Sequence, residues 1–341
     1  YLIGVSELFS GNPRKGIEWL TLAESVIKKT GNLDELYART LYNMGVGYNF
    51  LGDYEQMSVY ILRSLEVERK LYGNDSPSLV QGLSSLVAAF LELQEYDRAV
   101  SSGSEAIAII NRQPPGMFPP MDEMDLYYNL GVCYYRLSDY SKAVLYLEKA
   151  ESLYSAANMT GDEKYINLIN SLAVTYGYLG QSERSVDLYS KGMKIAETVN
   201  SSMSYNFINS YAIVLGNSGR IAEGQSILSS LLDRVGKIYG KKSGSYIEVL
   251  YNYAEYLRIY KIDHVRSMSL YEECLRYTEL HPDEPALRDP VMLGYALSLS
   301  ENHQNEKALE WITRLSDQVS GSSDGPDASS LKADQKSLRI L

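Results

Sequence analysis

A small residue recurs along this chain at intervals of 39 to 44 residues, and this period restricts the possible folds more than any other feature. Each of these register residues follows a large apolar residue or a tyrosine. The register residues are Gly4, Gly45, Val87, Gly131, Ala173, Ala212, Ala254 and Ala296. A fixed period of this length is typical of repeat proteins, in which each unit packs against its neighbours because it cannot bury its apolar face alone.

Residues at fixed offsets from the register residues show the periodicity of helices. Large residues stand three positions later, as at Tyr48, Phe90, Tyr134 and Tyr176. Small residues return twelve positions later, as at Gly16, Ala99, Ala143 and Ser185. Turn residues such as Gly52-Asp53 and Gly180-Gln181 lie between them, and a glycine just after a helix takes the left-handed conformation that caps its last carbonyls. Each repeat is therefore predicted to be an antiparallel helical hairpin.

The segment from Leu41 to Tyr48, LYNMGVGY, recurs as YYNLGVCY from Tyr127 to Tyr134, and more loosely from Ile169 to Tyr176. These residues resemble the tetratricopeptide repeat over nearly the whole chain. The period of about 42 residues exceeds the usual 34. Together with LYGNDSP at 71–77 and IYGKKSG at 238–244, this length resembles the kinesin-light-chain variety. The resemblance implies an all-α fold, a right-handed superhelical solenoid of about eight antiparallel helical hairpins.

Two segments depart from the period. Residues 111–122 contain four prolines and are predicted to form a longer connection, in which Phe118 either contacts a ligand or packs back on the array. Residues 1–319 are predicted to form the repeat array. Residues 320–341 open as a Ser/Gly-rich flexible linker or C-terminal tail, with 331–341 as a candidate partial cap. We expect the array to belong to a larger protein, and the resemblance implies an attached C-terminal signalling or protease-like domain.

Charge and composition narrow the possible partners. The formal net charge of -11 and the pI near 4.9 argue against a nucleic-acid surface and make a basic partner more plausible than an acidic one. No apolar run has the roughly 18 to 20 residues that a membrane helix needs. Cys133 and Cys274 stand far apart without a metal-binding pattern, which favours a reducing, cytoplasmic location.

No catalytic constellation, metal site or cofactor motif is found in the sequence. His264, His281 and His303 are predicted to lie in turns or connections, without a second ligand or an acidic partner at helical spacing. Cys133 is interpreted as a small buried residue rather than a nucleophile. The sequence therefore predicts a protein that is not an enzyme.

Arrays that resemble this one bind extended peptides on the concave face formed by their first helices, often through an asparagine two positions before the register residue. Asn43, Asn129 and Asn252 occupy that position, and Ser85, Ser171 and Ser210 replace it in other repeats. An amide offers a donor and an acceptor to a peptide backbone. The alternative, that these asparagines bond to the adjacent repeat, stays open at this point.

The candidate peptide-binding surface also includes neighbouring positions of the first helices. These are Arg39, Tyr42, Asn49, Tyr128, Tyr135, Arg136, Asn170, Asn209, Tyr251 and Arg258. The predicted function is a module that binds a protein or an extended peptide on the concave face, as the recognition or regulatory part of a larger protein. A structural or oligomerisation scaffold without a groove ligand is the alternative.

Overall fold

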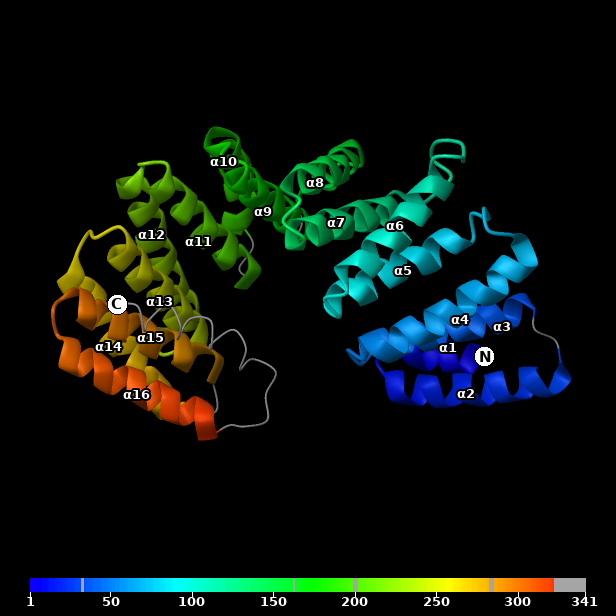
Figure 1. Ribbon diagram of the computed structural model, residues 1–341, viewed down its shortest axis with the longest axis horizontal. Coiled ribbons are helices and arrows are strands. Elements are labelled where there is room, and N and C mark those ends of the chain that lie inside the picture. The colour runs from blue at the N-terminus through cyan, green and yellow to red at the C-terminus, as the bar shows by residue number, and fades with distance from the viewer. Residues whose placement is uncertain (32–33, 162, 199–201, 282–284, 322–341) are drawn as a thin grey trace. The chain divides into compact units, whose positions relative to one another are not determined.

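The computed structural model describes residues 1–31, 34–161, 163–198, 202–281 and 285–321. Within these ranges the chain forms sixteen α-helices and no strand, which confirms the all-α prediction. Consecutive helices pack in pairs as antiparallel hairpins (Figure 1). The contacts divide the chain into two compact units, residues 1–195 and 196–341, and each is described by itself. The predicted tail at 320–341 lies outside the described residues from residue 322 onward, and the last helix extends to Gly321.

Unit 1 contains the first ten helices, the last of which extends past the unit boundary. Their bounds are α1 Leu2–Phe9, α2 Pro13–Thr30, α3 Glu35–Phe50, α4 Tyr54–Tyr72, α5 Leu79–Glu92, α6 Tyr96–Ile110, α7 Pro120–Arg136, α8 Tyr140–Ala156, α9 Glu163–Tyr178 and α10 Ser182–Thr198. Odd-numbered helices are the first helices of the hairpins. Helices α2, α4, α6 and α8 also pack on the first helix of the hairpin that follows each of them, so the hairpins of unit 1 stack.

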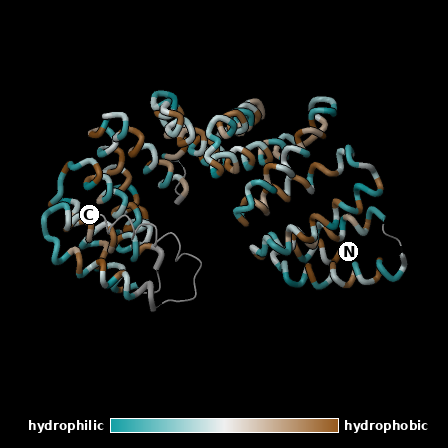
Figure 2. Tube along the Cα trace, viewed as in Figure 1, coloured by the Kyte–Doolittle hydropathy of each residue, from teal (hydrophilic) through white to brown (hydrophobic). Residues whose placement is uncertain are grey.

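Unit 2 contains the remaining helices. Their bounds are α11 Ser202–Asn217, α12 Ile221–Tyr239, α13 Gly244–Ile259, α14 His264–Leu280, α15 Pro285–Glu301 and α16 Asn305–Gly321. The pairs α11–α12, α13–α14 and α15–α16 form the hairpins of this unit. Figure 2 shows apolar and hydrophilic stretches alternating along the helices, as helices with one buried face require.

The register residues lie where the two helices of a hairpin approach most closely. A Cβ atom added to Gly45 would lie 2.7 Å from Cδ1 of Ile61 on the second helix, and one added to Gly131 would lie 2.6 Å from Cγ of Leu147. Ala173 and Ala254 at the same position are fully buried. The period of small residues therefore records the helix crossings, as the sequence pattern predicts.

The turn of every hairpin has one residue in the left-handed conformation, seven positions after the register residue. Four of these residues are glycines: Gly11, Gly52, Gly180 and Gly219. The other four are Gln94, Ser138, Lys261 and His303, with φ between 52° and 61°. Aspartates cap several of the following helices; for example, Oδ1 of Asp263 accepts a hydrogen bond from the backbone N–H of Arg266 at 2.8 Å.

Many tyrosines pack between the helices of a hairpin. The ring of Tyr48 stacks on Tyr60 with 5.3 Å between centroids, and Tyr134 stacks on Tyr146 at 5.2 Å. Both pairs join the large residue three positions after the register residue to the second helix of the same hairpin. Tyrosine therefore serves mainly in packing at these positions.

The proline-rich connection between α6 and α7 spans residues 111–119 and is three residues shorter than predicted. Pro120 takes the first position of α7, where a missing N–H costs no hydrogen bond. Phe118 is half-buried against the core formed by α4 to α7, whereas Met117 is exposed. The structure thus shows the packed alternative for Phe118.

A buried carboxylate joins the first hairpin to the second. Glu24 of α2 is 7% exposed and forms an ion pair with Arg63 of α4. It forms a second ion pair with Lys28, whose Nζ lies 2.8 Å from Oε1 of Glu24. The hydroxyl of Tyr37 on α3 donates to Oε1 of Glu24 at 3.4 Å. Burial raises the pKa of Glu24, but the hydrogen bonds from Lys28 and Arg63 outweigh it and hold this pKa below its usual value.

We expect glycine to stabilise the turns that lack it. The left-handed conformation of Lys261 costs a residue with a side chain about 1 to 2 kcal/mol. In Lys261→Gly this strain is relieved, and the gain in stability is partly offset by the greater freedom of glycine in the unfolded chain. The melting temperature, followed by circular dichroism, should rise. The reciprocal variant Gly219→Lys should melt at a lower temperature. An unchanged or lower melting temperature for Lys261→Gly would contradict the assigned turn.

The Glu24 ion pairs predict a pH-dependent stability. Since the folded-state pKa of Glu24 is lowered, its contribution is present above the unfolded pKa and disappears as the pH falls through the folded pKa. The variant Glu24→Gln should lose about 1 to 2 kcal/mol at neutral pH by removing the charged partner of Arg63. Thermal unfolding between pH 7 and pH 3 should show that the difference in melting temperature between the wild type and Glu24→Gln decreases as the pH falls. Glu66→Gln, which alters an exposed pair with Lys70, should melt like the wild type.

Candidate functional site

A groove of about 750 Å³ lies in unit 1 along three successive first helices, α1, α3 and α5, and the end of α4. Its lining is Tyr1, Val5, Phe9, Glu35, Ala38, Arg39, Tyr42, Asn43, Val46, Glu68, Tyr72, Ser78, Gln81 and Gly82. Three of the residues predicted for peptide binding, Arg39, Tyr42 and Asn43, therefore come together in one groove. The lining mixes carboxylates, a guanidinium, amides, aromatic rings and aliphatic side chains.

Helix α3 supplies the central wall of the groove. The helix begins at Glu35 because Oδ1 of Asp34 accepts hydrogen bonds from the backbone N–H groups of Leu36 and Tyr37, at 3.0 and 3.3 Å. Residues four apart on a helix share a face. The side chains that line the groove from α3 thus follow one another along its length, from Glu35 at the start to Val46 near the end.

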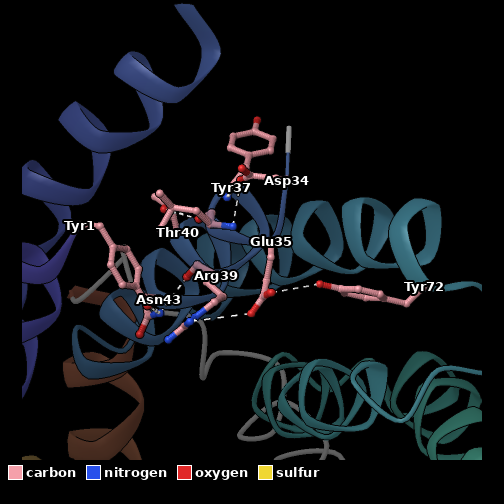
Figure 3. A network of polar contacts seen from close by, with 9 residues as sticks. Tyr1, Asp34, Glu35, Tyr37, Arg39, Thr40, Asn43 and Tyr72 are labelled. Atoms are coloured by element: carbon pink, nitrogen blue, oxygen red, sulfur yellow. Dashed lines mark hydrogen bonds and ion pairs between the residues drawn. The ribbon is translucent and has the colours of Figure 1, made fainter. Parts of the chain in front are cut away.

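A line of polar contacts runs along this wall (Figure 3). Nδ2 of Asn43 donates to the hydroxyl of Tyr1 on α1 at 3.2 Å and to the backbone carbonyl of Arg39 at 2.8 Å. A guanidinium nitrogen of Arg39 lies 3.8 Å from Oε1 of Glu35. The hydroxyl of Tyr72 on α4 donates to Oε2 of Glu35 at 3.3 Å. These contacts join α3 to Tyr1, the residue just before α1, and to Tyr72 at the end of α4.

The contact between Tyr1 and Asn43 belongs to a recurring bond between repeats. A tyrosine three positions before one register residue pairs with the polar residue two positions before the next. The other examples are Tyr42 with Ser85, whose hydroxyls are 3.3 Å apart, and Tyr128 with Ser171. Burial raises the pKa of Tyr42 and of Tyr128. For Asn43, the structure therefore shows the bond to the adjacent repeat that the sequence left as an alternative.

This bond leaves Asn43 with one unused group. Both N–H groups of its amide are engaged, while Oδ1 accepts no hydrogen bond from another residue that the structure describes. The oxygen remains available to a donor such as a peptide N–H. Asn43 can thus join two repeats and still accept a hydrogen bond from a ligand.

The carboxylates of the groove differ in their surroundings. Burial raises the pKa of Glu68, and the charge of Glu35 adds to this effect, although hydrogen bonds with Ser78 and Ser64 oppose it. Oγ of Ser64 lies 3.2 Å from Oε1 of Glu68. Burial also raises the pKa of Asp122 on α7, whose charge acts on the hydroxyl of Tyr42. Two carboxylates, Glu35 and Glu68, thus line the groove, and the charge of Asp122 on α7 acts on its lining residue Tyr42.

The other predicted asparagines do not line this groove. They are Asn49, Asn129, Asn170, Asn209 and Asn252. Oδ1 of Asn170 accepts a hydrogen bond from the hydroxyl of Tyr189 at 2.8 Å, so this amide serves the packing of α9 on α10. Asn49 is exposed at the end of α3. Asn129, Asn209 and Asn252 are half-buried on α7, α11 and α13.

Two more predicted residues lie at the end of α7, outside the groove. The ring of Tyr135 packs against Tyr140 and Tyr178, with centroids 5.8 and 5.6 Å away. Burial and the hydrogen bond with Tyr178 raise the pKa of Tyr135 to about 12. Arg136 is exposed beside this cluster. Tyr135, Tyr140 and Tyr178 form a packed aromatic cluster between neighbouring hairpins.

In unit 2, Arg258 is engaged in the structure itself. Its guanidinium donates to Glu255 at 2.8 Å and to Glu301 on α15 at 2.7 Å, and its side chain is only 13% exposed. Tyr251 is half-buried with its ring 6.2 Å from that of Tyr271, and burial raises its pKa to about 12. The ion pair with Glu301 holds α13 to α15, and with Glu255 also bound this guanidinium is not free for an acidic ligand.

Some groove residues were missed by the sequence reasoning. Tyr1 occupies the same repeat position as Tyr42, and Gln81 the same position as Arg39, so the repeat register contained a signal for both. Val5 and Val46 are equivalent in the same way. Glu68 and Tyr72 come from a second helix, and nothing in the register points to them.

The two cysteines are buried, and the three histidines lie at the ends of a helix or in a turn. Burial raises the pKa of both Cys133 and Cys274 to about 12, as is usual for inert buried thiols. His264 begins α14, His281 follows it and stacks on Tyr277 at 4.0 Å, and His303 lies in a turn. Among the described residues no cluster of three metal-ligating side chains occurs. None of the described helices has both the length and the apolar character needed to cross a bilayer.

Comparison with known proteins concerns the repeats and the fold. A family profile of the tetratricopeptide repeat matches residues 36–112 and 122–198. No curated protein matches the chain. A putative kinesin light chain from Podosopora anserina, with nearly identical TPR-like repeats, has a TM-score of 0.52 at 16% identity, covering 60% of this chain and 98% of that one.

Two further solved structures have the same fold. The apo form of RapI has a TM-score of 0.54 at 15% identity, covering 92% of this chain and 97% of that one. The C-terminal part of a TPR repeat-containing protein from Cytophaga hutchinsonii has a TM-score of 0.54 at 13% identity, covering 84% and 98%. These structural likenesses concern the fold alone. The two profile matches show tetratricopeptide repeats in residues 36–112 and 122–198, and the stacked hairpins have the fold of a tetratricopeptide-repeat array, which supports a protein-interaction scaffold.

Proposed function

We propose that the chain holds a segment of a partner protein in the groove of α1, α3 and α5, as the recognition part of a larger protein. The observation that carries this proposal is a groove of about 750 Å³ formed by the first helices of three consecutive repeats. Binding clefts commonly have volumes of about 300 to 1,000 Å³.

The lining supports a peptide-like occupant. Oδ1 of Asn43 offers an acceptor, and the exposed amide of Gln81 offers both a donor and an acceptor to a backbone. Tyr1, Tyr42 and Tyr72 present ring surface together with hydroxyls, a combination that is enriched at protein interfaces. Val5 and Val46 add an aliphatic surface at the other end of the groove. The groove thus has a polar end and an aliphatic end, which suits an elongated segment.

The two buried thiols support a reducing location, and we propose the cytoplasm. Cys133 and Cys274 are free and fully buried in different units. Free thiols are common where glutathione keeps cysteines reduced.

A bulky side chain in the groove should abolish docking without unfolding the array. Gln81 is exposed and lines the groove, so Gln81→Trp fills it at a helix cost of only a few tenths of a kcal/mol. Gln56→Trp makes the same change at an exposed position of α4 outside the groove. Wild type and both variants are panned against a random twelve-residue peptide library displayed on phage. Peptides enriched on the wild type should bind Gln56→Trp equally and Gln81→Trp at least tenfold more weakly.

Melting temperatures of the three proteins establish that each is folded. If enriched peptides bind Gln81→Trp as well as they bind the wild type, the groove is not the docking site. If no peptide is enriched on the wild type above the background of Gln81→Trp, docking is rejected in favour of a scaffold without a groove ligand.

A further inference from the structure

Glu68 differs from Glu24, Glu105 and Glu151, three other partly buried carboxylates of unit 1, in lacking a basic partner. Glu24 pairs with Arg63, Glu105 with Arg69 at 2.7 Å, and Glu151 with Lys191 at 2.7 Å. Glu68 is half-buried, yet it forms no ion pair with any residue that the structure describes. Its contacts are with the hydroxyls of Ser64 and Ser78.

This carboxylate is unfavourable for the fold by itself. Burial raises the pKa of Glu68, so its charged form destabilises the folded state at pH values above its folded-state pKa. The O–H groups of the two serines donate hydrogen bonds to the carboxylate but supply no positive charge. A cation from outside the chain would complete this environment.

Other groups at the same end of the groove suit a cation. Glu35 lines the groove with Glu68, and its charge acts on Glu68. The ring of Tyr72 lines this end and its hydroxyl donates to Glu35, so the ring can pack against the stem of a long side chain. The charges of Asp122 on α7 and of Glu68 both act on the hydroxyl of Tyr42. Several acidic groups therefore surround one end of the groove.

The one basic residue in the lining does not cancel this charge. Arg39 lies 3.8 Å from Glu35, and its guanidinium lies 5.7 Å from the centre of the Tyr1 ring. The lining contains Glu35 and Glu68 against this single guanidinium. The formal charge of the whole chain, -11, has the same sign.

Resting on the docking function proposed above, we propose that the occupant is an extended protein segment that places a Lys or Arg side chain between Glu35 and Glu68. An apolar side chain of the same segment contacts Val5 and Val46. Glu35 and Val46 are eleven positions apart and therefore about 16 Å apart along the helix. An extended chain rises about 3.3 Å per residue, so the basic and the apolar residue of the ligand are about five positions apart. Oδ1 of Asn43 accepts a backbone N–H between them.

The test compares two carboxylates on the same helix. Glu68→Gln removes the groove charge and keeps the shape of the side chain. Glu66→Gln makes the same chemical change at an exposed position of α4 that faces away from the groove and pairs with Lys70. Peptides that bind the wild type but not Gln81→Trp, selected from the random twelve-residue library, are synthesised as probes. Their dissociation constants are measured by isothermal titration calorimetry on the full chain.

We expect these peptides to share a Lys or Arg about five positions from an apolar residue. Glu68→Gln should weaken their binding about tenfold, as the loss of one partly desolvated ion pair implies. Glu66→Gln should bind like the wild type. Replacing the peptide's basic residue by Met should weaken binding to the wild type at least as much, and the same replacement should cause a smaller loss on Glu68→Gln, where only Glu35 remains to pair with the basic residue. The melting temperature of Glu68→Gln should equal or exceed that of the wild type.

Two results would overturn this inference while leaving docking intact. One is a set of groove-dependent peptides that lack a shared basic residue or bind Glu68→Gln and the wild type equally. The other is a set of acidic peptides whose binding is lost in Arg39→Gln. Peptides that bind Gln81→Trp unchanged would instead reject the docking function, and this inference with it.

Discussion

The close approach of two helices at a small residue is the contact on which the rest of the structure depends. A Cβ atom added to Gly16 would lie 2.4 Å from Cδ2 of Leu8, and one added to Gly4 would lie 2.8 Å from Cγ of Leu20. A larger residue would overpack such a crossing at a cost of about 1 to 3 kcal/mol. Because this close approach fixes how α4 packs against α3, it also fixes where Glu68 and Tyr72 lie beside α3.

The stacking of the hairpins uses polar groups as well as apolar ones. The recurring tyrosine bonds, such as Tyr42 with Ser85, align successive first helices, and Glu24 with Arg63 joins the first two hairpins. Groups that hold the repeats together therefore also line the groove. The same side chains can serve both roles because a buried amide or hydroxyl is hydrogen-bonded within the fold and can still have a donor or acceptor left for a ligand.

The electrostatics separate structural carboxylates from groove carboxylates. Glu24, Glu105 and Glu151 have basic partners on neighbouring helices, and each pair joins two helices. Glu68 has hydroxyl partners, and burial raises its pKa. Desolvation is compensated in the first group by a charge within the chain, whereas in Glu68 it is not. The distinction rests on partners that are distant in sequence, so composition and net charge do not reveal it.

The amino-acid sequence by itself determined the repeat, its register, the hairpins and the turns, because small residues, helix periodicity and turn residues act locally. It also indicated Arg39, Tyr42 and Asn43. Only the tertiary structure decided which faces meet: that Asn43 bonds Tyr1, that Arg258 is occupied by Glu255 and Glu301, and that Glu68 enters the groove from a second helix. The physical reason is that a repeat fixes the offset of a residue within its hairpin, whereas the partner across a helix contact depends on how neighbouring hairpins stack.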